Sequence, residues 1–255
     1  MNEIKNTEYR PLVSIIIAVL NGAKTLQSCL NSIEVQDYTD WELIILDGGS
    51  TDGTEEIINA SKCVTYSVSE PDGGIYSAWN KGLGVAKGKW VCFLGADDQW
   101  ANETSLSMLV NAAYSKEVDL VSGKMVTVNE NGRIKRTFGK PWNWVDMKKY
   151  CCITHCGTLH RADLFQKFGR FSENYSIASD YEFLLRIGKN TRAAFVDEVV
   201  VKMGDCGVSR TSIRKIFTEV KQMQSVHPEI GPLSALNNYY LAFAKYFVRK
   251  TFNSF

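Results

Sequence analysis

Two adjacent acidic residues, Asp97 and Asp98, directly follow the apolar run 90–94. Two carboxylates at the exit of a buried strand repel each other and lose hydration, unless a positive charge lies beside them. In proteins this charge is often a divalent cation whose remaining ligands come from a diphosphate. The pair therefore predicts a metal-diphosphate site. An alternative interpretation is a cap on the helix expected near 102–113, although this explains only one of the two carboxylates.

A second candidate is Asp47, which ends another apolar run and begins the sequence Asp-Gly-Gly-Ser-Thr-Asp-Gly. A carboxylate at this place can accept a hydrogen bond from a nucleobase N–H, and the glycines let a ligand approach the backbone. A turn followed by a helix cap is the alternative. The run matches neither the dinucleotide-binding glycine fingerprint nor a Walker A loop, which leaves a metal as the means of neutralising phosphate.

The third candidate is the sequence Ser179-Asp180-Tyr181-Glu182, at the expected start of an apolar helix. The dipole of a helix favours ionised carboxylates in its first turn. One of the two acids can then act as a general base that deprotonates an acceptor hydroxyl. The alternative is that Ser179 or Asp180 only caps the helix.

The fourth candidate, His155, lies in a segment with a second histidine, His160, and three nearby cysteines. Structural zinc is not favoured, because Cys151 and Cys152 are adjacent and no Cys-x-x-Cys pair has a matching partner downstream. A position near the reacting phosphate or the acceptor is the functional interpretation of His155. A buried, hydrogen-bonded histidine is the alternative.

The elements that must position these residues alternate between strand and helix signals in the first half of the chain. Repeated units of this kind predict an α/β fold with a mostly parallel, twisted sheet flanked by helices. Ligands of such sheets bind beyond the carboxyl ends of the strands, which here are Asn21, Asp47, Asp72 and Asp97-Asp98. The expected strands are 12–20, 41–46, 64–68 and 90–94, and the expected helices 23–36, 54–60 and 75–86.

The second half predicts a hairpin of strands 120–128 and 134–138 around the turn 129–132, followed by helices. We find no internal repeat and no low-complexity linker, so one compact domain with a helical tail is the simplest organisation. The expected helices are about 162–168, 179–187, 212–226 and 233–251.

The composition excludes several classes of protein. With 29 Lys and Arg against 28 Asp and Glu, the formal net charge is +1, which argues against a nucleic-acid binder. The 7 cysteines are scattered, and the polar start 1–10 lacks the apolar region of a secretory leader. We therefore expect reduced thiols and a cytoplasmic location, and no apolar run is long enough to span a bilayer.

The joint pattern resembles the family 2 glycosyltransferases of the GT-A fold, the nucleotide-diphospho-sugar transferase fold. The resemblance covers about residues 12–210. The motifs are most similar to those of the bacterial branch that builds O-antigen, colanic acid and related exopolysaccharides. Its motifs are Val13-Ser14-Ile15-Ile16-Ile17, Asp47-Gly48-Gly49-Ser50-Thr51-Asp52-Gly53, Pro71-Asp72-Gly73-Gly74-Ile75-Tyr76, Asn80-Lys81-Gly82, Gly95-Ala96-Asp97-Asp98, His155-Cys156-Gly157 and Ser179-Asp180-Tyr181-Glu182.

The resemblance implies an inverting, metal-dependent sugar transfer from a UDP-sugar. It gives Asp180 the role of catalytic base and Asp98 that of ligand to Mn²⁺ or Mg²⁺. This chain has two adjacent acids where many members have Asp-x-Asp, so the share of Asp97 in the metal stays open. The other positions implied for the nucleotide-sugar are Ala18, Asn21, Asp47, Asp72, Gly73, Lys81 and Asp97, and those for the acceptor or phosphate side are His155, Glu182 and Trp142.

The resemblance also suggests boundaries: a transferase domain at 11–210, with a donor-binding half at 11–100 and an acceptor half at 101–210, and a helical extension at 211–255. The stretch 239–250 mixes aromatic and cationic residues at helical spacing. We expect it to contact the inner face of the plasma membrane, near a lipid-diphosphate-linked glycan acceptor. A helix packed on the domain with snorkelling lysines is the alternative.

Two other functions fit parts of the sequence. A nucleotidyltransferase uses a similar sheet and acid, but it needs a basic glycine-rich loop after the first strand, and 21–24 is a poor version of one. A non-catalytic nucleotide- or sugar-binding module has no need of a base such as Asp180.

Overall fold

The computed structural model describes residues 13–114, 117–128, 133–204 and 212–252. The strands are β1 (Val13–Val19), β2 (Trp41–Asp47), β3 (Tyr66–Ser69), β4 (Trp90–Gly95), β5 (Asp98–Trp100), β6 (Leu120–Val128), β7 (Ile134–Phe138), β8 (Leu159–Arg161) and β9 (Ala193–Met203). The helices are α1 (Leu26–Glu34), α2 (Thr54–Ala60), α3 (Ile75–Val85), α4 (Ser105–Tyr114), α5 (Trp144–Met147), α6 (Asp163–Phe168), α7 (Ser179–Ile187), α9 (Ile213–Val226) and α10 (Gly231–Phe252).

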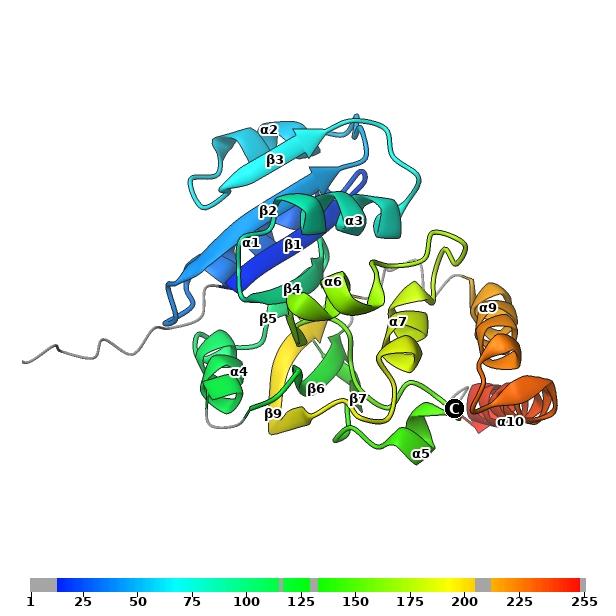
Figure 1. Ribbon diagram of the computed structural model, residues 1–255. Helices are drawn as coiled ribbons and strands as arrows, with labels where there is room; N and C mark the ends of the chain where they lie inside the picture. Colours follow the sequence, from blue (N-terminus) through cyan, green and yellow to red (C-terminus); the bar gives the residue numbers. More distant parts are fainter. Residues whose placement is uncertain (1–12, 115–116, 129–132, 205–211, 253–255) are drawn as a thin grey trace, which may run out of the picture.

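One mixed sheet runs through the molecule, in the order β3-β2-β1-β4-β8-β6-β9-β5 with β7 beside β6 (Figure 1). The first four strands are parallel, as predicted, because a crossover helix connects each of them to the next. The short strand β8 joins them to the second half by antiparallel pairing with β4 and β6. The sheet is thus parallel in the half that carries most of the predicted donor residues.

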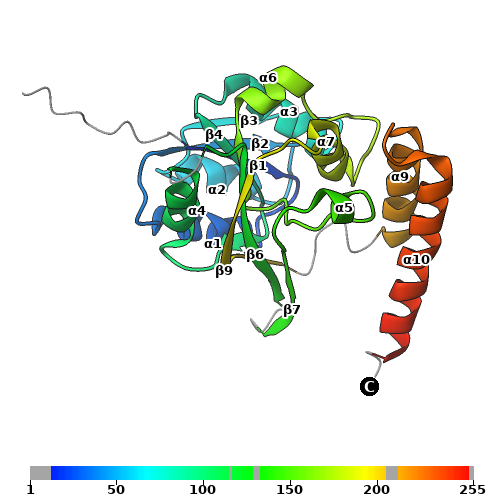
Figure 2. The same ribbon diagram turned by 60° about the horizontal axis from the view of Figure 1, so that its bottom comes forward.

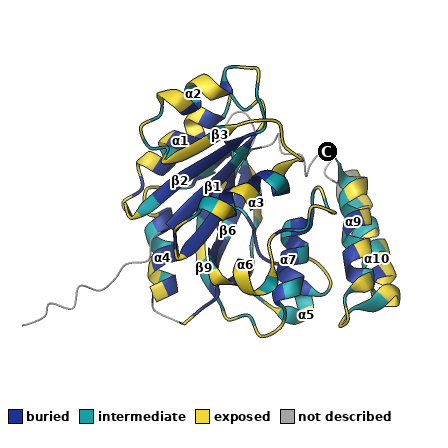
Figure 3. Cartoon of the chain, turned by 45° about the horizontal axis from the view of Figure 1, so that its top comes forward, coloured by how far each residue is buried: buried dark blue, intermediate teal, exposed yellow. Residues whose placement is uncertain are grey.

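The sheet separates two hydrophobic clusters. Alternate side chains of β1 enter opposite clusters: Ile15 and Ile17 face α1, whereas Ile16 faces α3. Burial on both faces explains the continuous apolar runs of these strands. Figure 3 shows β1 and β2 buried, while α2 and α10 carry many exposed residues.

The C-terminal helices α9 and α10 pack against each other at one side of the sheet, and α9 also packs against α7 (Figure 2). Both were predicted within two residues of their ends. None of the helices in the described part of the chain has both the length and the hydropathy that crossing a membrane requires.

The predicted elements of the first half are confirmed, with shifts of a few residues at their ends. The hairpin of β6 and β7 is confirmed as well, whereas its turn 129–132 lies outside the described residues. Strands β5, β8 and β9 were not predicted. The interpretation of Asp97-Asp98 as a helix cap is wrong: α4 begins at Ser105, and Asn102 Oδ1 accepts the hydrogen bond from Thr104 N, at 3.3 Å.

Helix α3 lies close to the sheet at Gly82, where a Cβ would be 2.6 Å from Ile16 Cγ2 and 3.0 Å from Leu46 Cδ2. We expect Gly82→Ala to lower the free energy of unfolding by about 1–3 kcal/mol, because the methyl group overpacks this contact. Urea unfolding measures the change.

The matched control is Gly84→Ala in the same helix, where a Cβ would meet only the Arg170 guanidinium, at 3.6 Å or more. Here the better helix propensity of alanine should raise the free energy of unfolding by about 0.5–1 kcal/mol. Equal effects at the two glycines would contradict the close packing of α3 on the sheet.

Candidate active site

The carboxyl ends of β2, β1 and β4 lie side by side. Ala18 at the end of β1 pairs in register with Leu46 on one side and with Gly95 on the other. The loops that follow these strands therefore meet at one edge of the sheet. This edge carries Asn21 and Asp47 and the Asp97-Asp98 pair, as predicted from the sequence.

Asp97 and Asp98 pack against glycines. A Cβ on Gly95 would lie 2.9 Å from Asp97 Oδ1 and 3.0 Å from Asp98 Oδ2, and a Cβ on Gly204 would lie 2.9 Å from Asp97 Oδ2. Asp98 is only 2% exposed, and its Oδ2 accepts a hydrogen bond from Gly95 N at 2.8 Å. Within the described residues, Asp97 Oδ2 and Asp98 Oδ1 are buried without a hydrogen-bond partner.

The ionised forms of Asp97 and Asp98 are disfavoured. Burial, followed by the charge of Asp97, raises the pKa of Asp98 to about 7, and the nearby Cys156 thiol offsets only part of this rise. Burial also raises the pKa of Asp97. Removing carboxylates from water without donors has this effect, and a bound cation would reverse it.

The residues present fit a hard divalent cation. Two carboxylates with buried, unpartnered oxygens are suitable ligands for Mg²⁺ or Mn²⁺, which bind one or two protein carboxylates and complete their shell with phosphate and water. Among the described residues, no cluster of three or more His, Cys, Asp or Glu could hold an ion by itself. The two carboxylates therefore fit a cation whose remaining ligands come from a bound group such as a diphosphate.

Asp47 is fully hydrogen-bonded. It is 2% exposed; its Oδ1 accepts from the Ser50 hydroxyl, and its Oδ2 accepts from Ser50 N at 3.1 Å and Ser69 Oγ at 2.6 Å. Hydroxyl donors can reorient when a stronger donor arrives. Asp47 is thus held by hydrogen bonds at the edge of the sheet, where the nucleobase was predicted.

The loop after β1 is tied to the loop after β2. Asn21, in a left-handed conformation with φ of 52°, accepts from Thr51 N at 3.0 Å. Gly22 N donates to Thr54 Oγ1 at 2.9 Å, and Ala23 N donates to Asp52 Oδ2 at 3.0 Å. Because these amides already have acceptors, the loop does not provide the phosphate cradle that a nucleotidyltransferase needs.

Asp72 lies over Gly48, where a Cβ would be 3.4 Å from Asp72 Oδ2, and it accepts from Gly74 N at 2.7 Å. Gly73, between Asp72 and Gly74, leads into α3. Lys81, on the same helix, donates to Glu70 Oε1 at 2.7 Å. The structure thus brings Asp47 and Asp72 together, whereas the ammonium of Lys81 already has a carboxylate partner.

Asp180 lies in the first turn of α7 and contacts α3. Its Oδ1 is 3.1 Å from the hydroxyl of Tyr76, which also lies 2.7 Å from the Ile177 carbonyl oxygen. Burial raises the pKa of Asp180, and the hydrogen bonds from Tyr181 N and Tyr76 only partly oppose this rise. A raised carboxylate pKa suits a general base.

The Cys156 thiol links the two acidic groups. The charges of Asp98, Asp180 and Asp97 all raise its pKa, in addition to burial, the largest cause. The predicted metal ligand Asp98 and the predicted base Asp180, far apart in the sequence, are thus close enough for their charges to act on one thiol.

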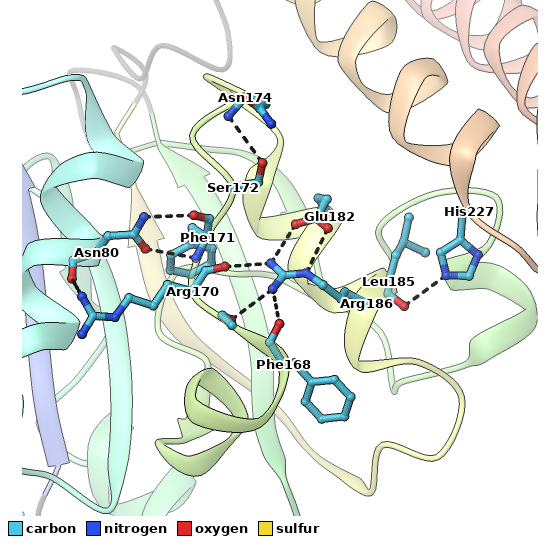
Figure 4. A network of polar contacts seen from close by, with 11 residues as sticks. Asn80, Phe168, Arg170, Phe171, Ser172, Asn174, Glu182, Leu185, Arg186 and His227 are labelled. Carbon is cyan, nitrogen blue, oxygen red and sulfur yellow. Dashed lines mark hydrogen bonds and ion pairs between the residues drawn. The ribbon is translucent and has the colours of Figure 1, made fainter.

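Glu182 has a partner of its own. Its Oε1 accepts from Arg186 Nε at 3.0 Å and its Oε2 from Arg186 Nη2 at 2.9 Å. The same guanidinium donates to the carbonyl oxygens of Phe168, Gly169 and Arg170, so the pair fastens the loop before α7 (Figure 4). This contact supports a structural role, and the predicted role on the acceptor side stays a prediction.

His155 and Trp142 lie in aromatic surroundings. The His155 ring stacks on Phe93 at 5.3 Å and 18° and contacts Trp79 at 5.1 Å. Burial lowers the pKa of His155 to about 3, so the ring is neutral. Trp142 stacks on Trp144 at 6.4 Å, which occupies one of its faces. The predicted roles of both residues toward phosphate or acceptor stay predictions.

Three further residues at the site were not predicted from the sequence: Tyr76, Cys156 and Glu219. Glu219 on α9 accepts hydrogen bonds from the segment just before α7. The interpretation that Asp180 or Ser179 caps this helix is wrong, because both lie after the N-cap position and the described residues give Ser179 Oγ no hydrogen-bond partner. The N-cap residue, Ala178, has no side-chain hydrogen bond. One feature of the sequence could have indicated Glu219: it is the only acidic residue of 213–226.

A curled, mixed sheet flanked by helices is the GT-A fold, and residues 14–181 match the family "Glycosyl transferase family 2". The chain belongs to this family. The resemblance to glycosyltransferases is thereby confirmed, whereas its assignment to the O-antigen and colanic acid branch stays a prediction.

Several known proteins are similar to the chain. A PGL/p-HBAD biosynthesis glycosyltransferase of Mycobacterium bovis is 32% identical over 219 residues, 81% of this chain and 82% of the relative. An uncharacterized glycosyltransferase of Rickettsia typhi is 28% identical, over 84% of this chain and 70% of the relative.

Among solved structures, S. aureus TarS 1-349 in complex with UDP-GlcNAc superposes with a TM-score of 0.69 at 19% identity, over 89% of this chain and 70% of TarS 1-349. The mannosyltransferase PcManGT of Pyrobaculum calidifontis, in complex with GDP-Man and Mn²⁺, gives a TM-score of 0.65 at 20% identity. This superposition covers 93% of this chain and 75% of PcManGT. At these identities the likeness concerns the fold.

The buried Asp98 carboxylate gives a prediction on stability. Its folded-state pKa of about 7 exceeds the ordinary value of 3.8, so the folded protein binds the proton more tightly than the unfolded chain. Stability should therefore fall as the pH rises through this interval. In EDTA at pH 8, we expect Asp98→Asn to raise the free energy of unfolding by roughly 1–3 kcal/mol, and to have little effect near pH 4.

Asp52→Asn provides a control of opposite sign. Hydrogen bonds, the largest from Thr54, lower the pKa of Asp52, so its replacement should destabilise the protein at pH 8. Urea unfolding at the two pH values measures both variants. A loss of stability in Asp98→Asn at pH 8 would contradict an uncompensated charge at this position.

Proposed function

We propose that the protein is a metal-dependent, inverting glycosyltransferase that moves a sugar, a hexose or a related sugar, from a UDP-sugar to a hydroxyl group of a glycan. The observation that carries this proposal is the Asp97-Asp98 pair at the carboxyl edge of the sheet, where two buried carboxylate oxygens, Asp97 Oδ2 and Asp98 Oδ1, lack hydrogen-bond donors among the described residues. The role would lie in cell-envelope polysaccharide biosynthesis of the O-antigen type.

The donor would lie along the carboxyl ends of β1, β2 and β4. Asp47 would accept the N–H of the base, with Asn21 and Asp72 beside the nucleoside and the backbone of Ala18 and Gly73 close to it. Lys81 would approach the donor only by leaving Glu70, a partly exposed pair. The UDP and UDP-GlcNAc complexes of TarS 1-349 support the choice of a uridine donor.

Asp98, together with Asp97, would hold Mn²⁺ or Mg²⁺ against the diphosphate, and Mn²⁺ in the PcManGT complex supports this. When bound, such an ion stabilises the charge that develops on the leaving UDP, as a Lewis acid. The two carboxylates in turn regain the positive partner that their burial requires.

Asp180 would accept the proton of the acceptor hydroxyl as its oxygen attacks the anomeric carbon. The attack comes from the face opposite the leaving UDP, so a single displacement inverts the configuration and forms no covalent intermediate. The buried position of Asp180 supports this role, because it raises the affinity of the carboxylate for the proton. Trp142 and Trp144 would stack on acceptor sugars.

We place the boundary between transferase domain and helical extension at 210–211, with the donor and acceptor halves meeting near 100. The extension would contact an anionic lipid surface on the cytoplasmic side and bring the site close to a lipid-linked acceptor. Two features support this contact: 231–252 contains Lys245, Arg249 and Lys250 and no acid, and α10 exposes a row of apolar side chains, namely Leu233, Leu236, Tyr240, Leu241, Phe247 and Val248.

The test of the activity is release of UDP from a panel of UDP-sugars with lipid-linked glycan acceptors. We expect release with Mn²⁺ and its loss in EDTA. Asp180→Asn should lower kcat about 10²-fold or more while UDP binding stays unchanged, because only the proton transfer is affected.

Glu182→Gln is the matched control on the same helix turn, and its effect on kcat should be much smaller because Glu182 is bonded to Arg186. Equal activity of Asp180→Asn and the wild type would refute the assignment of the base. Pyrophosphate release from a nucleoside triphosphate would instead favour a nucleotidyltransferase.

The lipid contact is tested by flotation with vesicles of phosphatidylcholine, with and without phosphatidylglycerol. We expect binding to the anionic vesicles that decreases with salt. Tyr240→Ser with Phe247→Ser should abolish it, whereas Ile134→Ser with Val145→Ser, exposed elsewhere, should not. Equal binding of the two double variants would contradict a role for α10.

A further inference from the structure

The segment just before α7 is held by a side chain from another helix. Ala178, the N-cap residue of α7, makes no side-chain cap hydrogen bond. The carboxylate of Glu219, from α9, instead accepts the N–H groups that lead into the helix. Its Oε1 accepts from Ser176 N at 3.0 Å and Ser176 Oγ at 2.9 Å, and its Oε2 accepts from Ile177 N and Ala178 N at 3.0 Å each.

Glu219 is buried and charged. The residue is only 6% exposed. Burial raises its pKa, but the amide groups of Ser176 and Ile177 outweigh this, so the pKa of Glu219 lies below its ordinary value. A carboxylate with this many donors is a strong, well-defined contact. Helix α9 is thereby fixed to the segment 176–178.

The same segment is held from its other side by α3. The Ile177 carbonyl oxygen lies 2.7 Å from the Tyr76 hydroxyl, and this hydroxyl is 3.1 Å from Asp180 Oδ1. Glu219 and Tyr76 thus hold one segment of three residues between them. Asp180 follows this segment after a single intervening residue.

We propose that Glu219 is a positioning residue for the base Asp180: by fixing 176–178 it keeps the Ile177 carbonyl, the Tyr76 hydroxyl and the Asp180 carboxylate in one hydrogen-bonded chain. This inference rests on the proposed transferase function. It makes the C-terminal extension a part of the active site.

This series of hydrogen bonds can form whether the Asp180 carboxylate is ionised or protonated. Before transfer, the single proton of the Tyr76 hydroxyl is donated to the Asp180 carboxylate. After Asp180 has taken the proton from the acceptor hydroxyl, it can donate that proton to the Tyr76 oxygen while the Tyr76 proton turns to the Ile177 carbonyl. The second arrangement requires that this carbonyl stays in place, which depends on Glu219.

The test compares Glu219→Gln with the wild type. Glutamine keeps the shape but loses the charge and half of the acceptor capacity. We expect kcat of sugar transfer to fall roughly 10- to 100-fold, as a small displacement of a base does. KM for the donor and Kd for UDP should stay within about twofold, because within the described part of the chain Glu219 hydrogen-bonds to 176–178 and not to Asp47 or Asp98. Amide hydrogen exchange at Ile177 and Ala178 should accelerate.

Asp119→Asn is the matched control. Asp119 is likewise buried. Its carboxylate accepts a hydrogen bond from Arg192 N at 2.9 Å and forms an ion pair with Arg161. Arg161 pairs with Trp90, at the end of β4 opposite the site. This variant should lose stability without losing kcat. In addition, Tyr76→Phe and Glu219→Gln should combine less than additively in kcat, since both act through one chain.

A kcat of Glu219→Gln within about twofold of the wild type would overturn the inference, as would unchanged exchange at Ile177 and Ala178. If the variant does not fold, Ser176→Ala removes one of the hydrogen bonds to Glu219 and should still lower kcat roughly threefold at constant donor KM. An unchanged kcat in Ser176→Ala would contradict the inference. A wild-type protein that transfers no sugar would refute the proposed function, and the exchange rates would still decide whether Glu219 holds the segment.

Discussion

A carboxylate that is removed from water must receive donors or a cation, or it gives up its charge. The structure depends on this constraint, because it buries several acids close together and treats each differently. Asp47 receives two hydroxyls and an amide. Glu219 receives three amides and a hydroxyl. Asp98 receives one backbone amide, and Asp180 receives the Tyr181 amide and shares the one proton of Tyr76. The carboxylates whose pKa burial raises, Asp97, Asp98 and Asp180, are those proposed to bind the metal or to take the proton.

The sheet makes this uneven distribution possible. Its parallel half brings three strand ends to one edge, and the glycines at 95 and 204 let the backbone approach the Asp97-Asp98 carboxylates closely. The second half, in which parallel and antiparallel pairs are mixed, carries α7. The charges of the proposed metal ligand Asp98 and the proposed base Asp180, one from each half, both act on the Cys156 thiol.

What the sequence predicted depended on local patterns. Asp47 and Asp97-Asp98 were found because each follows a continuous apolar run, and such runs mark buried parallel strands and their ends. The strand β9 was not predicted, since its run 193–203 contains Asp197, Glu198 and Lys202 and lacks a clean period. Tyr76 and Glu219 were missed for another reason. Their partners are 104 and 41–43 residues away, and no local period records a contact of that separation.

The hydrogen bonds of Glu219 also bear on how enzymes of this kind diversify. The part of the chain that matches the family model ends at residue 181, so Glu219, which holds the segment before the helix of the proposed base, lies beyond the matched residues. A lineage that exchanges its C-terminal helices would therefore also exchange this contact. Selection can then adjust the rate of the chemical step through an appendage, without a single substitution in the inherited catalytic motifs.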